Sequence, residues 1–441
     1  MESASDSKLK VSITINIYID THTQASTTFD HPTDLLTFST TNTFARTLDS
    51  ISKLKIPSEI DLDLLTIAIA ANNDTTHDTQ IRKEVTEIIK KYPSIKHFLF
   101  LNSDILPSPS SPSSSPEPEP KTEPITETEA ETEREREKAL KIKELKKLFL
   151  NTSGYCEIRN VGFIMAYYNN TDVLIQIDDD ELMREHYLLR LMYVLDNYKE
   201  IGVLSGFYEE NGSVLYDEEK DYVSWRKDFA MNQDRRIILS NEGEPLNLLY
   251  GMGGNMVCRK EFFQRICYMQ ALPRGEDFGV LLSAWLVYLH GNSLCDIQSR
   301  NPFFRSFATS DEQMTIIHKQ PYSEKKDREK YIKLNFIRFM MERNFCQGNV
   351  DLDEYQALSY YMYNMTMLDN FVTKMEEVYE EAVERNECRK EVKDEHLAEL
   401  KTFYEEIQSR NLFEEYKKYQ KNYIDFLKLV KIDISQFQVD F

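Results

Sequence analysis

Three consecutive aspartates follow a short apolar segment in the middle of the chain, within the sequence VLIQIDDDE (residues 173–181). The apolar residues predict a buried strand, and in open α/β sheets ligands gather beyond the carboxyl ends of the strands. Carboxylates at such a position suit a hard divalent cation, Mg²⁺ or Mn²⁺. In an extended chain, alternation places Asp178 and Asp180 on the same side. The competing interpretation is an acidic loop that caps the following helix.

Strands and helices that alternate along the chain must position these aspartates. Hydrophobic periodicity predicts strands at residues 10–20, 64–71, 98–101, 172–177, 203–208 and 256–258, and helices at 43–54, 80–91, 134–149, 157–168, 183–198, 260–268 and 276–289. This order favours a mostly parallel sheet covered by helices. We expect one α/β domain over residues 1–325 and a helical C-terminal region over residues 326–441, whose aromatic stripes would pack on the parent domain or on a partner chain.

An acidic Pro/Ser/Glu-rich run interrupts the first domain at residues 107–133. It contains few apolar side chains, so it buries too little surface to offset the entropy of ordering, and we expect it to be disordered. The formal net charge of the chain is -21. A nucleic-acid partner is therefore not expected, because binding a phosphate backbone requires a basic face.

The six cysteines form no Cys-x-x-Cys pair, which gives no reason to expect a zinc knuckle or a disulfide framework. The N-terminal residues have no apolar signal core, and no uncharged apolar stretch has the length of a membrane span. We expect a soluble, cytoplasmic protein. Peripheral membrane association stays open, since an acceptor could be linked to a lipid.

Six motifs in a fixed order resemble the inverting family 2 glycosyltransferases, which have a GT-A fold. The resemblance spans roughly residues 35–322 and rests on LLTFSTTNTFARTLDSI (35–51), LLTIAIAANNDTT (64–76), EIRNVGFIMAYYNNTDVLIQIDDDE (157–181), GMGGNMVCRKEFF (251–263), PRGEDFGVLLSAWLVYLHG (273–291) and TIIHKQP (315–321). The first loop has Thr-Thr-Asn where that family commonly has a Pro-containing turn. The second strand ends in Asn-Asn-Asp in place of a run of acids.

The resemblance implies a metal-dependent glycosyltransferase that moves a sugar from a nucleotide-diphospho-sugar to a hydroxyl of a glycan, lipid or protein. The implied ligands of Mn²⁺ or Mg²⁺ are Asp178, Asp180 and His318. Asp277 would be the general base, with Glu276 orienting the acceptor or the base. The implied contacts of the nucleotide-sugar are Thr40, Thr41, Asn72, Asp74, Arg159, Asp178, Asp179, Gly253 and Gly254.

Each assignment has a structural alternative. Glu276 and Asp277 could complement a helix dipole, and His318 could serve in packing or hydrogen bonding. Arg159 could form an ordinary ion pair and the glycines a tight turn. Tyr208 and Trp225 could stack on a sugar or pack in the core.

Three other functions remain compatible with the residues. The first is an inactive protein of the same fold that binds sugars or acts as a scaffold. The second is a sugar-nucleotide pyrophosphorylase, although residues 35–51 contain no glycine for its phosphate loop. The third is a glycosyltransferase that retains the anomeric configuration, in which Asp277 would not act as a base.

Overall fold

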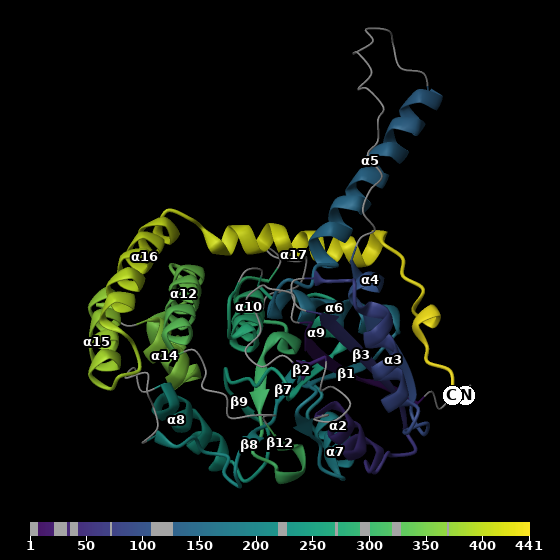
Figure 1. Cartoon of the computed structure of the whole chain (residues 1–441), viewed down its shortest axis with the longest axis horizontal. Coiled ribbons are helices and arrows are strands. Elements are labelled where there is room, and N and C mark those ends of the chain that lie inside the picture. Colours follow the sequence, from purple (N-terminus) through teal and green to yellow (C-terminus); the bar gives the residue numbers. More distant parts are fainter. Residues whose placement is uncertain are drawn as a thin grey trace.

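A nine-stranded sheet lies at the centre of the protein, with helices on both faces (Figure 1). The computed structural model describes residues 8–21, 33–35, 43–70, 73–106, 127–218, 227–269, 272–291, 300–319, 328–367 and 370–441. The strands follow the spatial order β4 (Lys96–Leu101), β3 (Ile60–Ala70), β1 (Leu9–Asp20), β5 (Val173–Asp178), β10 (Met256–Arg259), β7 (Val203–Ser205), β11 (Ser306–Ala308) and β9 (Leu246–Asn247), with β2 (Thr33–Asp34) paired to β1.

Most neighbouring strands of this sheet run parallel. β10 is antiparallel to β5 and β7, and β9 is antiparallel to β11, whereas the other pairings are parallel. The predicted α/β architecture with a mostly parallel sheet flanked by helices is therefore confirmed. Since parallel strands need crossover connections, helices cover both faces of the sheet.

Strand β1 is buried on both faces. Its odd-numbered residues, from Val11 to Ile19, pack in a hydrophobic cluster with α2 (Thr43–Ser52), α3 (Asp78–Ile89) and α7 (Tyr187–Asn197). The opposite face of β1 contains buried Ser12, Thr14 and Asn16 and contacts α6 (Tyr155–Tyr168), where a Cβ on Gly162 would lie 3.3 Å from Cγ2 of Thr14. The helix can thus approach the sheet closely and bring Arg159 near the strand ends.

A second, three-stranded sheet lies beside the carboxyl end of β5. It consists of β6 (Glu181–Leu182), β12 (Ile316–His318) and β8 (Tyr208–Glu209), with β12 in the middle. The register places His318 opposite Glu181. This small sheet fixes the late histidine next to the acidic motif, although more than 130 residues separate them in the sequence.

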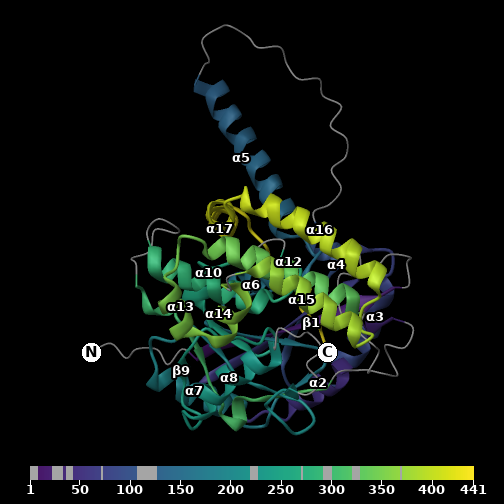
Figure 2. The same cartoon turned by 90° about the vertical axis from the view of Figure 1, so that its left-hand side faces the viewer.

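The remaining helices contribute to a second hydrophobic cluster. This cluster includes residues of the sheet and of the C-terminal region. These helices are α4 (Asn102–Ile105), α5 (Glu127–Phe149), α8 (Lys227–Leu239), α9 (Lys260–Phe263), α10 (Glu276–His290), α12 (Arg328–Cys346), α13 (Leu352–Leu358), α14 (Tyr360–Thr366), α15 (Phe371–Glu384), α16 (Lys390–Gln408) and α17 (Leu412–Leu429), with short 3-10 turns at Pro302–Phe304, Glu312–Met314 and Ile434–Phe437. Figure 2 shows α12, α16 and α17 on the side of the molecule from which α5 projects.

The C-terminal region returns to the N-terminal half of the sheet. Tyr423 of α17 donates a hydrogen bond of 2.6 Å to the carbonyl of Phe263, and Lys141 of α5 forms a 2.6 Å ion pair with Asp425. Beyond α17, the Val439 amide donates to the carbonyl of His97 in β4 over 2.8 Å. Helices α12 to α17 lie within residues 328–429, and they share one hydrophobic cluster with the sheet.

The boundaries of several elements differ from those predicted. Helix α5 begins at Glu127, so residues 127–133 are helical where the sequence indicates disorder, while residues 107–126 lie outside the described part of the chain. The polar helix α8 was not predicted, because its buried face includes Asn232, Asp234 and Arg235, whose partners are distant in sequence. In the described part of the chain, no helix has both the length and the apolar character required to cross a bilayer.

Candidate active site

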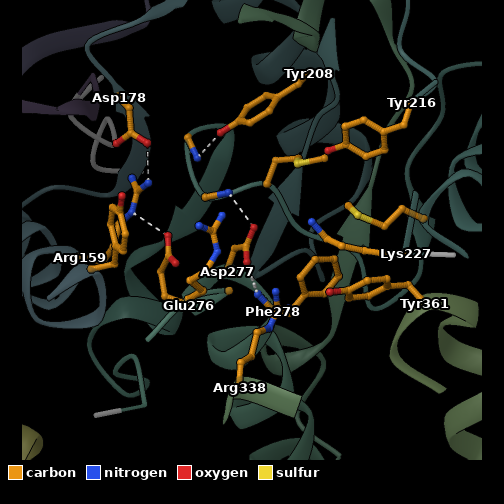
Figure 3. A pocket seen from close by; sticks show the side chains of 17 residues that line it. Arg159, Asp178, Tyr208, Tyr216, Lys227, Glu276, Asp277, Phe278, Arg338 and Tyr361 are labelled. Carbon is orange, nitrogen blue, oxygen red and sulfur yellow. Dashed lines mark hydrogen bonds and ion pairs between the residues drawn. The ribbon is translucent and has the colours of Figure 1, made fainter. Parts of the chain in front are cut away.

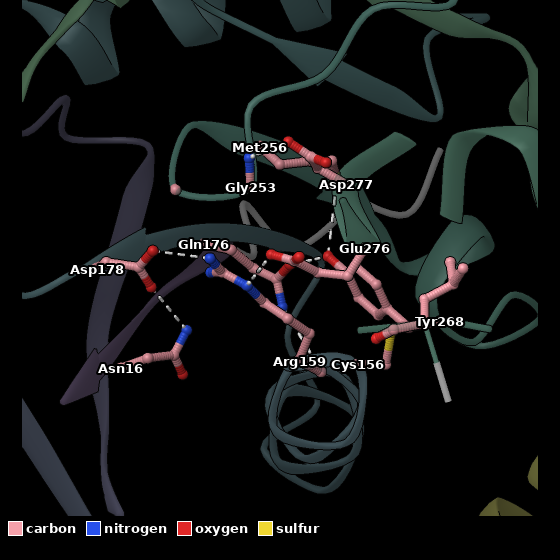
Figure 4. Close-up of polar contacts among 12 residues, drawn as sticks. Asn16, Cys156, Arg159, Gln176, Asp178, Gly253, Met256, Tyr268, Glu276 and Asp277 are labelled. Atoms are coloured by element: carbon pink, nitrogen blue, oxygen red, sulfur yellow. Dashed lines mark hydrogen bonds and ion pairs between the residues drawn. The ribbon is translucent and has the colours of Figure 1, made fainter. Parts of the chain in front are cut away.

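The first aspartate of the acidic motif ends strand β5 and contacts both neighbouring elements (Figure 4). Asn16 lies opposite Asp178 in the parallel register of β1 and β5, and its amide donates to Oδ1 over 3.3 Å. Arg159 of α6 donates from Nη2 to Oδ2 over 2.8 Å. Burial raises the pKa of the Asp178 carboxyl; Arg159 opposes this rise, and Asp180 adds to it. The structure thus places an ion pair between buried Arg159 and half-buried Asp178 at the predicted end of the strand.

The second aspartate points toward helix α2. Its carboxylate accepts a hydrogen bond of 2.8 Å from the Thr43 hydroxyl, and its carbonyl accepts one of 2.7 Å from Thr47. Asp179 is 6% exposed. Asp179, which we predicted to contact the nucleotide, therefore connects the acidic loop to α2 in this structure.

The third aspartate and the late histidine lie together. Nε2 of His318 is 3.4 Å from Oδ2 of Asp180, and Nδ1 is 2.9 Å from Oε1 of Glu210. The imidazole also stacks on Tyr208, with ring centroids 5.1 Å apart. Burial alone would lower the pKa of His318, but the hydrogen bonds to Asp180 and Glu210 outweigh it and raise the pKa to about 10. Two of the three predicted metal ligands are thus neighbours.

Glu181, which we did not single out from the sequence, lies at the centre of the acidic loop. It is 1% exposed, and its Oε2 accepts a 2.7 Å hydrogen bond from the Asp178 amide. The Tyr208 hydroxyl donates to the same carboxylate and accepts from the Gly254 amide over 2.6 Å. A Cβ on Gly254 would overlap the Glu181 carboxylate. Glycine is needed here because the backbone lies directly against the buried acid.

The predicted Glu-Asp pair begins helix α10 and faces the same glycine segment. The Gly253 amide donates to Oδ2 of Asp277 over 3.2 Å, and the Phe278 amide donates to Oδ1 over 2.8 Å. Oε1 of Glu276 is 3.7 Å from Nε of Arg159. Burial raises the pKa of Glu276 to about 7, with a further contribution from Asp277. Close to neutral pH, Glu276 can therefore exist in either protonation state.

One cavity of about 200 Å³ brings most of these groups together (Figure 3). Its walls include the predicted residues Arg159, Asp178, Gly253, Gly254, Glu276 and Asp277. Asp180 and His318 are not part of the cavity wall, although His318 stacks on Tyr208, which is part of that wall. Asp178 at the end of β5 and the Glu276–Asp277 pair at the start of α10 thus reach one cavity, whereas Asp180 and His318 lie outside its wall.

The other predicted nucleotide contacts lie elsewhere or outside the described residues. Asp74 accepts hydrogen bonds from Thr76 and Thr21 and contacts His77 over 3.1 Å. Burial alone would raise the pKa of Asp74, but these hydrogen bonds outweigh burial and lower the pKa to about 2. Thr40, Thr41, Asn72 and Trp225 are not in the described part of the chain.

The cavity also contains basic and aromatic residues that sequence reasoning missed. They come from five separate helices and loops and are Lys227, Arg274, Arg338, Tyr216 and Tyr361. Only Arg338 gives a signal in the sequence, because a charged residue stands there among the apolar residues of a helical stripe.

Comparisons with known proteins give limited similarity. No protein-family model matches the chain, and no curated protein matches its sequence. Among solved structures, a mannosyltransferase from Pyrobaculum calidifontis, in complex with GDP-Man and Mn²⁺, is similar at 10% identity and a TM-score of 0.40, over 96% of this chain and 86% of that one. TarS from S. aureus is similar at 11% identity and a TM-score of 0.37, over 93% of this chain and 55% of that one. Similarity at this level carries no conclusion about the present chain.

Proposed function

We propose that the protein is a metal-dependent glycosyltransferase of GT-A type that transfers a sugar from a nucleotide-diphospho-sugar to a hydroxyl acceptor with inversion. The observation that carries this proposal is the cavity shared by Asp178, at the end of a central parallel strand, and by Glu276 and Asp277, at the start of an apolar helix. Ligands bind at such strand ends in open α/β sheets. Acid groups from two separate elements converge there.

Asp180 and His318 would hold Mg²⁺ or Mn²⁺ once Nε2 of His318, which lies 3.4 Å from Oδ2 of Asp180, gives up its proton to make room for the ion. The second ring nitrogen of His318 contacts Glu210, and this kind of outer contact fixes the tautomer and orientation of a ligating imidazole. Within the described residues, no group of three or more His, Cys, Asp and Glu side chains could by itself hold a metal. Two protein ligands suit these ions, because they commonly complete their shells with substrate phosphates and water. When bound, the ion supplies positive charge that stabilises a diphosphate leaving group.

The protein residues divide the remaining work. Arg159 holds the Asp178 carboxylate in place over 2.8 Å and adds positive charge close to the strand end. Asp277 accepts the proton of the acceptor hydroxyl as general base. The Gly253 amide, 3.2 Å from Oδ2, fixes the orientation of that carboxylate. Glu276, with a pKa of about 7, orients the acceptor through a hydrogen bond in either protonation state.

A panel of UDP-, GDP- and other nucleotide sugars with Mn²⁺ tests the proposal, scored by thermal shift and nucleotide release. We expect one donor to bind and to release its nucleotide slowly in the presence of the metal. Asp180→Ala should weaken donor binding at least about tenfold, since even altered outer contacts of a metal ligand cost that much. Asp196→Ala is the matched control, because the Asp196 side chain is 64% exposed and forms a surface ion pair with Lys199.

The outcomes separate the candidate functions. If no nucleotide sugar binds with either metal, the proposal is wrong. Binding without nucleotide release or transfer to any acceptor would identify an inactive sugar-binding protein. Once a product is in hand, NMR of its anomeric centre distinguishes inversion from retention. A retained configuration would remove Asp277 from the role of base.

A further inference from the structure

Three cations gather at one end of the cavity, although the chain has a net charge of -21. Lys227 begins α8, Arg274 precedes α10 and Arg338 lies on α12; all three form part of the cavity wall. In Figure 3, Arg159, Asp178 and Glu276 lie on one side of the view, Lys227 and Tyr361 lie on the other, and Asp277 lies between the two groups. The cavity thus has an acidic end and a basic end.

Arg338 is buried at the basic end. It is 4% exposed, and its Nε donates to Oε1 of Glu342 over 2.9 Å. Its Nη2 has no hydrogen-bond partner in the described part of the protein. The guanidinium packs against the rings of Phe278 and Tyr361, and a Cβ on Gly275 would overlap it. A buried donor without a partner destabilises the protein, so a ligand that accepts this hydrogen bond is favoured.

Lys227 and Arg274 meet on one aromatic ring. Nζ of Lys227 donates to the Tyr331 hydroxyl over 2.8 Å and lies 5.5 Å from the centroid of that ring. The Arg274 guanidinium lies 4.4 Å from the same centroid. Among the residues that the structure places, no carboxylate forms an ion pair with Lys227. Two cations are therefore held close together on the ring of Tyr331, and in the described part of the chain the Lys227 ammonium hydrogen-bonds to a phenol.

We propose that the acceptor carries a phosphate group, which Lys227, Arg274 and Arg338 bind while the acceptor hydroxyl faces Asp277. This inference rests on the proposed glycosyl transfer. A phosphate offers several charged oxygens to donors from different directions, and the planar fork of arginine matches it well. The diphosphate of the donor would lie outside the cavity wall, near Asp180 and His318, so the two phosphorylated substrates place their phosphates at different positions.

Calorimetric titration of the full chain with glucose 6-phosphate, glucose and inorganic phosphate tests the basic end without any nucleotide sugar. We expect glucose 6-phosphate and phosphate to bind and glucose not to bind measurably. Lys227→Met should weaken the binding of glucose 6-phosphate by about tenfold to a hundredfold, the range for one charged hydrogen bond. Arg274→Gln should have a similar effect, and it avoids the risk that a change at buried Arg338 prevents folding.

The matched control is Lys374→Met, since Lys374 is an exposed lysine paired with Glu377. It should bind glucose 6-phosphate like the parent. Equal binding by the parent and Lys227→Met would overturn the inference, as would equal binding of glucose and glucose 6-phosphate. If Lys227→Met weakens nucleotide-sugar binding as strongly as phosphate binding, the cations serve the donor and the inference is also wrong.

The two proposals fail in different ways. If phosphate binds at Lys227 but no nucleotide sugar binds with a metal, glycosyl transfer is wrong and the acceptor role is lost with it. If a nucleotide sugar binds and depends on Asp180 while phosphate shows no dependence on Lys227, only the phosphorylated acceptor is wrong.

Discussion

Replacement of Gly254 by alanine tests whether the glycine segment is shaped by the buried acid beneath it. A Cβ at this position would overlap the carboxylate of Glu181, which must then move. Movement of the Glu181 carboxylate breaks the 2.7 Å hydrogen bond that it accepts from the Asp178 amide. The movement also disturbs the Tyr208 hydroxyl, which contacts both Glu181 and the Gly254 amide. A buried polar group that loses its hydrogen bond lowers the free energy of unfolding by about 1–3 kcal/mol, and overpacking lowers it by a similar amount.

We therefore expect Gly254→Ala to lower the free energy of unfolding by about 3–5 kcal/mol, a large part of the stability of a typical domain. Urea unfolding followed by circular dichroism measures the loss. Glu181→Ala removes the overlapping group, so adding Gly254→Ala to it should cost no more than about 1 kcal/mol. A single-variant loss below about 1 kcal/mol, or an equal loss in both backgrounds, would refute the reasoning.

Two further predictions concern the acidic pair at the start of α10. Asp277→Asn should retain donor binding but lower the transfer rate by about a hundredfold to ten-thousandfold, the usual contribution of a general base; transfer at the parental rate would contradict that role. Glu276 has a pKa of about 7 in the folded protein, above its usual value of 4.5, because it is buried beside Asp277. The folded state then binds more protons than the unfolded state between about pH 4.5 and 7, so the contribution of Glu276 to stability falls as the pH rises through this range. Glu276→Gln should flatten this part of the stability profile measured by urea unfolding, and an unchanged slope would rule out Glu276 as its source.

The parts of the fold that follow a simple periodicity could be predicted from the sequence. Strand β1 alternates apolar residues, and α10 is a long apolar helix, so both were predicted close to their observed bounds. Helix α8 was missed, because it buries Asp234 against the amides of Tyr360 and Tyr361. Polar burial of this kind depends on partners that are distant in sequence, and no local pattern indicates it.

The candidate site shows the same division. The sequence predicts Asp178 at the end of a strand, and Asp178 does end β5, because the buried strand and the acidic motif are adjacent in sequence. The sequence does not distinguish the role of Asp179 from the roles of its two neighbours, because its carboxylate contacts Thr43 of α2, which is distant in sequence. Lys227 and Arg274 meet on the ring of Tyr331, which lies on a third segment. Long-range packing brings these residues together, and the sequence carries no spacing rule for it.

Arg338 and Tyr361 complete the cavity from helices that follow the sheet in the chain, whereas the carboxylates come from earlier segments. During synthesis on the ribosome, Asp178 and Asp277 leave the exit tunnel before these two residues do. A nascent chain therefore contains the carboxylates, Lys227 and Arg274 while Arg338 and Tyr361 are still missing from the basic end. Translation order thus delays assembly of the complete site until α12 and α14 have been made and have docked.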